Sequence, residues 1–108
     1  MSFRKITAIA RPDLLNKIED ALKDAGVPGV SVSEVKGYGE YANRYAKDGM
    51  VAAIRIEVFI DAECAEAVAQ AIMQAAHTGL EGDGIVAIAP VEQIYHVRTK
   101  EACIKKPC

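Results

Sequence analysis

Two segments with helical spacing of apolar residues constrain the fold of this chain most strongly. In residues 13–25, apolar side chains recur three and four positions apart behind Pro12, and the pattern stops at Gly26. Proline at the start and glycine at the end are typical helix boundaries, with Gly26 expected as a left-handed cap. Residues 62–77 form a second, alanine-rich helical pattern, for which Asp61 is the expected N-cap.

The segments around these helices have the alternating apolar and polar side chains of half-buried strands. The expected strands are residues 3–10, 30–35, 50–60, 85–88 and 91–97, with Pro90 at the bend between the last two. The resulting order is β-α-β-β-α-β, which predicts an α+β, ferredoxin-like fold with an antiparallel sheet and two helices on one face.

The second face of such a sheet has no helices to cover it. Alternation in the first and third strands would place a partly apolar patch there, formed by Phe3, Thr7, Ile9, Val51, Ala53 and Phe59. A monomer rarely exposes such a patch, so we expect the chain to self-associate.

Composition bounds the class of protein. The 108 residues suit a single domain, and 13 basic against 15 acidic residues give a net charge of -2, which offers no global attraction for nucleic acid or an acidic membrane. No stretch approaches the roughly 20 apolar residues of a membrane span, and the N-terminus lacks the pattern of a signal peptide. We therefore expect a cytoplasmic protein without membrane insertion.

Five short motifs, in this order, resemble those of the PII signal-transduction proteins. They are residues 5–12 (KITAIARP), 31–39 (SVSEVKGYG), 55–58 (RIEV), 78–84 (TGLEGDG) and 97–99 (VRT). The resemblance covers residues 1–99, which we take as the domain, with a mobile T-loop at about residues 37–50; residues 100–108 are expected to form a C-terminal tail.

The resemblance implies a homotrimer with adenine-nucleotide sites in the clefts between subunits. The glycine-rich turn at residues 82–84 would face the phosphates, because consecutive backbone amides can converge on an anion there. A neighbouring subunit would supply Arg98, Ser31 would meet the adenine edge, and Ile9 would pack on the base. The nucleotide-binding residues implied in this way are Ile9, Ser31, Lys36, Gly37, Gly39, Phe59, Gly82, Asp83, Gly84, His96 and Arg98.

Several positions depart from the family pattern. Tyr41 replaces a glutamine that helps to hold magnesium and 2-oxoglutarate, and the lysines expected at two positions near the phosphates are Ala53 and Ile85. His96 replaces an arginine; it either keeps partial charge near a phosphate or has no role. Fewer cations favour ADP or AMP over ATP, which carries more negative charge.

The short T-loop and the cysteine-bearing tail are similar to those of the carboxysome-associated PII-like proteins. That likeness implies bicarbonate as a second ligand, with Gly39, Glu40, Tyr41 and Arg98 as candidates for its site. It also implies a regulatory role in carbon metabolism, through a T-loop partner such as a bicarbonate transporter.

The cysteines leave alternatives open. Cys103 and Cys108 form a C-x4-C pair that predicts either a small redox loop, two ligands for a soft metal, or an incidental pair in a disordered tail. Cys64 is expected in the core, and His77 in the last turn of the second helix. The competing function is a PII-like or CutA-like trimer with a metal or redox response through the terminal cysteines, whereas no constellation of residues predicts an enzyme.

Overall fold

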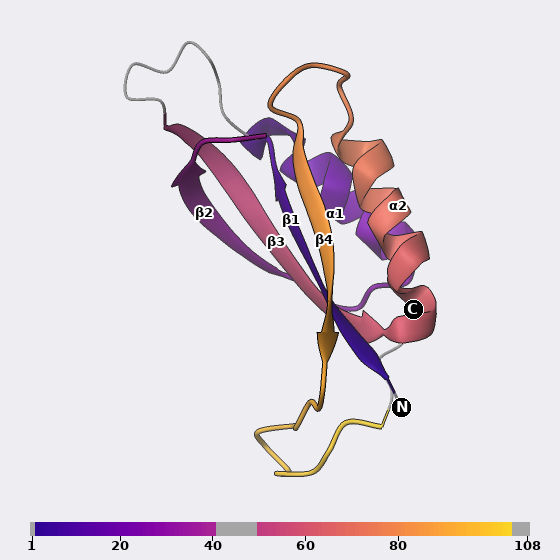
Figure 1. Ribbon diagram of the computed structural model, residues 1–108. Coiled ribbons are helices and arrows are strands. Elements are labelled where there is room, and N and C mark those ends of the chain that lie inside the picture. Colours follow the sequence, from indigo (N-terminus) through magenta and orange to yellow (C-terminus); the bar gives the residue numbers. More distant parts are fainter. Residues whose placement is uncertain (1, 41–49, 105–108) are drawn as a thin grey trace.

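Four antiparallel strands form the sheet of the computed structural model, in the order β2-β3-β1-β4 (Figure 1). The strands are β1 (Phe3–Ala10), β2 (Ser31–Gly37), β3 (Val51–Asp61) and β4 (Gly84–Val91). The structure describes residues 2–40 and 50–104. Both helices lie on one face of the sheet, which confirms the predicted ferredoxin-like arrangement.

The strand registers place the core on the helical face. In the ladder Ile6 pairs with Val58 on one side and with Ile88 on the other, and Ala8 pairs with Ile56. Paired residues of antiparallel strands share a face. Ile6, Ile56 and Val58 are almost fully buried, so this face carries the apolar contacts with the helices.

The first helix begins and ends as the sequence predicts. A short 3-10 turn (Pro12–Leu14) leads into α1 (Leu15–Asp24), whose Ile18 and Leu22 are buried. The amide of Val27 donates to the carbonyl oxygen of Leu22 at 3.0 Å, and Gly26 has a φ of 83°. This hydrogen bond and the positive φ form a glycine C-cap, which confirms the prediction for Gly26.

The second helix differs from its prediction at both ends. A 3-10 turn (Ala62–Cys64) precedes α2 (Ala65–Ala76), and the buried Asp61 makes no side-chain capping bond. Asp61 ends β3, and the amide of Ala62 donates to the carbonyl oxygen of Ser2 instead, at 2.9 Å. His77 adopts an extended conformation after the helix, so its predicted place in the last turn is wrong.

The C-terminal part also differs from its prediction. β4 continues through Pro90 without a bend, which an edge strand tolerates because the missing amide can face outward. Residues 92–97 form no further strand; only an isolated bridge joins Tyr95 to Ala102. The amide of Cys103 donates to the carbonyl oxygen of Ile94 at 2.7 Å, so residues 100–103 fold back instead of leaving as a tail.

The open face of the sheet is apolar in part, as expected. The side chain of Phe59 is 46% exposed there, whereas Thr7, Ile9 and Val51 are half-buried. Phe3 and Ala53 are buried, which contradicts their predicted exposure. Phe3 begins β1 and pairs with Val91 at the end of β4, and the small Ala53 is paired with the larger Val35.

Within the described residues, no helix has the length and apolar character needed to cross a bilayer.

Candidate functional site

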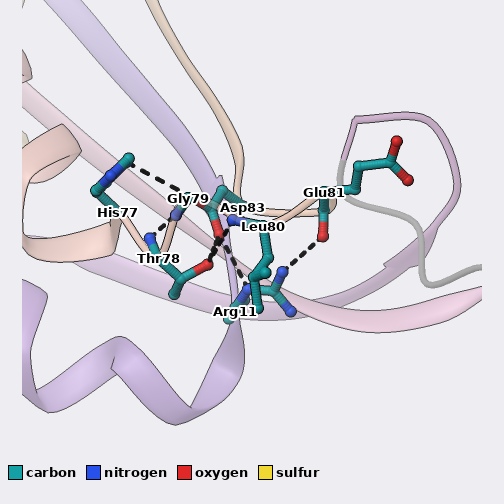
Figure 2. Close-up of polar contacts among 7 residues, drawn as sticks. All are labelled: Arg11, His77, Thr78, Gly79, Leu80, Glu81 and Asp83. Atoms are coloured by element: carbon teal, nitrogen blue, oxygen red, sulfur yellow. Dashed lines mark hydrogen bonds and ion pairs between the residues drawn. The ribbon is translucent and has the colours of Figure 1, made fainter.

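The loop between α2 and β4 is organised around the carboxylate of Asp83 (Figure 2). The amides of Thr78 and Gly79 donate to Asp83 Oδ2 at 2.9 and 3.0 Å. The Thr78 hydroxyl donates to Asp83 Oδ1, and the amide of Leu80 donates to the Thr78 hydroxyl oxygen at 3.2 Å. The aspartate therefore closes the first half of the glycine-rich loop on itself.

Arg11 ties this loop to the end of β1. Its Nε donates to Asp83 Oδ1 at 3.2 Å, and its Nη2 donates to the carbonyl oxygen of Glu81 at 2.6 Å. In Figure 2 the carbonyl of Glu81 faces Arg11, whereas its carboxylate points away from the cluster. The guanidinium of Arg11 thus holds two points of the loop that lie 72 and 70 positions later in the sequence.

The same contacts lower the pKa of Asp83 far below its ordinary value. The largest cause is the hydrogen bond from the Thr78 hydroxyl, followed by the Thr78 amide, while burial acts in the opposite direction. The Gly79 amide and Arg11 lower the pKa further. The ionised form of Asp83 is therefore the form that the folded loop stabilises.

This lowered pKa predicts that Asp83 contributes to the stability of the fold in a way that depends on pH. Because the pKa of Asp83 is lower in the folded than in the unfolded chain, its contribution should be complete above about pH 5 and should fall as the pH drops below about 4. We expect the melting temperature of the wild type to exceed that of Asp83→Asn at pH 7, and the gap to narrow in acid. Thermal melts of both proteins between pH 7 and pH 2.5 measure it; a gap independent of pH would contradict the assignment.

Gly84 fixes the point at which the loop joins the sheet. It has a φ of 113°, and a Cβ atom there would overlap the carbonyl oxygen of Ile9 and lie 2.9 Å from its carbonyl carbon. Only glycine permits this close approach of β4 to β1. Ile9 is thereby held directly beside the loop.

A cavity of about 540 Å³ lies between this loop and the end of β2. Gly39 and Glu40 line one side of it, and residues 80–84 line the other. Cavities that bind small molecules commonly have volumes of roughly 300–1,000 Å³. The structure thus brings together five of the predicted site residues, which are Gly39, Glu40, Gly82, Asp83 and Gly84.

The lining of this cavity is acidic. Three of the lining residues, Glu40, Glu81 and Asp83, are acidic, and no lysine or arginine is among the described residues that line it. Arg11, which bonds Asp83 and Glu81 from behind the loop, is not part of the lining. A ligand with several phosphates would need cations from elsewhere.

The other predicted residues lie apart from the cavity within one protomer. Ser31 pairs with Glu57, and Phe59 pairs with Lys5, farther along the sheet. Lys36 and Gly37 end β2, just before the cavity-lining Gly39. The segment of residues 92–104, which contains His96 and Arg98, lies at the opposite end of the sheet from the glycine-rich loop (Figure 1). Tyr41 is outside the described residues.

Of the alternatives left open for Cys103 and Cys108, the structure contradicts the redox loop. Among the described cysteines, Cys64 is in a disulfide, and it belongs to the core cluster as expected. Cys103 keeps its thiol and is buried, so it is not in a disulfide with Cys108, which lies outside the described residues. Burial explains the difference, because the backbone bond to Ile94 holds Cys103 inside the fold and not in a loose tail.

Sequence reasoning missed the roles of Arg11, Thr78 and His77. Arg11 and Thr78 stood in the recognised motifs without any assigned function, and His77 Nδ1 lies 3.9 Å from Asp83 Oδ2. One local signal was available: aspartate is a common turn residue because its carboxylate can accept nearby backbone amides. The contact with Arg11 had no signal of this kind.

Comparison with known proteins agrees with this geometry. Residues 3–101 match the family described as "Nitrogen regulatory protein P-II". The proteins of that name from Azospirillum brasilense and Cereibacter sphaeroides are 36% and 39% identical to this chain over 106 residues, which cover 91% of this chain and 94% of each relative.

A solved structure shows the same fold. The crystal structure of Arabidopsis thaliana PII bound to citrate superposes with a TM-score of 0.82 and is 34% identical, covering 96% of this chain and 88% of the plant chain. The matched residues include both the glycine-rich loop and the strands that hold it. The chain therefore belongs to the PII family of nitrogen regulatory proteins.

Proposed function

We propose that this protein is a PII-type regulator that binds ADP or AMP, and ATP more weakly, in clefts between the subunits of a homotrimer. Bicarbonate is the proposed second ligand. The binding state is passed through the loop after Gly39 to a partner such as a bicarbonate transporter, and so reports on inorganic carbon or energy supply. Proteins of the PII family are regulatory, and this role needs no catalytic residue.

The cavity between Gly39 and the glycine-rich loop is the observation that carries this proposal. It lies between the base of the predicted T-loop and the turn of residues 82–84, two of which are glycines. A nucleotide bound there would contact both segments at once. Its binding energy could then favour one loop conformation over another, which is what a relay requires.

The position of Arg98 supports a site shared between subunits. β4 starts at the glycine-rich loop and runs eight residues, or about 25 Å, before the segment that contains Arg98 begins. A guanidinium from the same protomer is therefore far from the cavity. The exposed Phe59 and the half-buried Ile9 on the open sheet face suit contact with further copies of the chain.

The acidic lining supports the preference for fewer phosphates. Each charge-assisted contact contributes about 1.5–3 kcal/mol, and the positions of Ala53 and Ile85 provide none. Glu40 and Glu81 add negative charge to the same cavity. A third phosphate would therefore gain little and meet repulsion.

Bicarbonate, as a compact anion, would take the space next to a nucleotide that lacks the third phosphate. The backbone amides near Gly39 and the guanidinium of Arg98 are its proposed donors. Titration calorimetry tests both parts of the proposal. We expect ADP or AMP to bind about tenfold more tightly than ATP, and bicarbonate to raise that affinity further. Tighter binding of ATP would contradict the first part, and an unchanged ADP affinity in bicarbonate would contradict the second.

The alternative of a metal or redox response depends on the terminal cysteines, of which Cys108 lies outside the described residues. Among the described residues, no three potential ligands from histidine, cysteine, aspartate and glutamate come together as a metal site.

A further inference from the structure

We propose that Asp83 is a positioning residue: with Arg11 and Thr78, its carboxylate holds the glycine-rich loop in the shape that presents the backbone of residues 82–84 to the phosphates, and the carboxylate itself does not contact the ligand. The inference rests on the proposed nucleotide site. It changes the role of Asp83 from the direct nucleotide contact that the sequence suggested.

The carboxylate of Asp83 has no capacity left for a ligand. An ionised carboxylate offers about four acceptor positions. Four donors already use them: the Thr78 hydroxyl and Arg11 Nε on Oδ1, and the amides of Thr78 and Gly79 on Oδ2. All four come from the protein, so the group is saturated before any ligand arrives.

The same bonds decide which amides can meet a phosphate. The amides of Thr78 and Gly79 donate to the carboxylate of Asp83, and the amide of Leu80 donates to the Thr78 hydroxyl oxygen. The first half of the loop is therefore closed to anions. Any phosphate contact is directed to the turn at residues 82–84, which line the cavity.

Arg11 fixes the position of this prefolded loop relative to the sheet. Its two bonds reach Asp83 and the carbonyl of Glu81, on either side of Gly82 (Figure 2). Neither Arg11 nor Thr78 lines the cavity. Their replacement can therefore affect a ligand in the cavity only through the loop, which separates positioning from direct contact.

The test compares three variants, Asp83→Asn, Thr78→Val and Arg11→Met, in two measurements. Hydrogen exchange of the ligand-free protein should show residues 78–84 exchanging about tenfold faster in each variant, with the strands unchanged. Calorimetry should show ADP affinity falling about tenfold in each. The double variant Asp83→Asn with Arg11→Met should lose little more than either single variant, because the residues act as one unit.

Matched controls keep the comparison specific. Thr78→Ser retains the hydroxyl and should behave as wild type, and Asp24→Asn removes an exposed carboxylate of α1 far from the loop and should change neither measurement. Loss of ADP binding in Asp83→Asn alone, with Thr78→Val and Arg11→Met binding normally, would show a direct contact and overturn the proposal.

Failure of the nucleotide site itself is recognisable separately. If the wild type does not bind ADP, the proposed function fails. Hydrogen exchange of the variants still tests whether Asp83, Thr78 and Arg11 hold the loop in place. Unchanged exchange of residues 78–84 in Asp83→Asn would then overturn the positioning role as well.

Discussion

Replacing Gly84 with alanine should lower the free energy of unfolding by more than about 3 kcal/mol. The added Cβ would overlap the carbonyl oxygen of Ile9 in a backbone conformation that L side chains rarely adopt. Relief would require β4 to move away from β1 at the first pair of their ladder. Urea unfolding followed by circular dichroism measures the loss.

Gly29 provides the matched control for this substitution. A Cβ at Gly29 meets no atom within 4 Å, and its φ is not in the left-handed range. Gly29→Ala should therefore leave stability unchanged or raise it slightly, by about 0.5 kcal/mol. Equal stability of the Gly84→Ala and Gly29→Ala variants would contradict the close approach between β4 and β1.

Replacing Arg98 with alanine should weaken ADP binding by about 10- to 100-fold without loss of fold or assembly. The cavity has no cation among its described lining residues, so a guanidinium from a neighbour would supply a charge-assisted contact of about 1.5–3 kcal/mol. Lys100→Ala, two positions along the same exposed segment, is the control and should bind ADP normally. Calorimetry compares the ADP affinities of the two variants, and equal affinities would show that Arg98 does not contact the nucleotide.

Mixed trimers test whether that arginine comes from a neighbour. Arg98→Ala subunits keep an intact glycine-rich loop, and Gly82→Val subunits keep Arg98 but strain a turn whose φ is 89°. Each variant alone should bind ADP poorly. When the two variants are refolded together in equal amounts, trimers assemble at random. About a quarter of the clefts would then combine an intact glycine-rich loop from one subunit with an intact Arg98 from its neighbour. Recovery of that fraction supports a shared site, and no recovery would place both residues in one protomer.

The sequence was sufficient for the parts of the fold that local patterns determine. The apolar stripe behind Pro12 and the cap at Gly26 predicted α1 correctly, because each depends on neighbours within a few residues. Asp61 stands at the predicted N-cap position but makes no side-chain capping bond, and the carbonyl oxygen of the distant Ser2 accepts the amide of Ala62. The return of the C-terminal segment to bury Cys103 likewise depends on contacts between distant parts of the chain.

The candidate site likewise combines features that local sequence predicts with features that depend on distant residues. The glycine-rich loop and the segment around Gly39 were predicted as parts of one site, and the cavity joins them. The role of Asp83 was predictable only in part, because three of its four donors are local but the fourth, Arg11, follows β1 and is distant in the sequence. Whether Ser31, Phe59, His96 and Arg98 complete the site depends on neighbouring subunits, so these assignments stay predictions.

Native mass spectrometry of the purified protein, with and without ADP, tests the central claim most directly, because it counts subunits and bound nucleotides together. The account predicts a trimer that takes up one ADP for each subunit at micromolar to millimolar concentrations, and less ATP under the same conditions. A monomer that takes up no adenine nucleotide at millimolar concentration would contradict it.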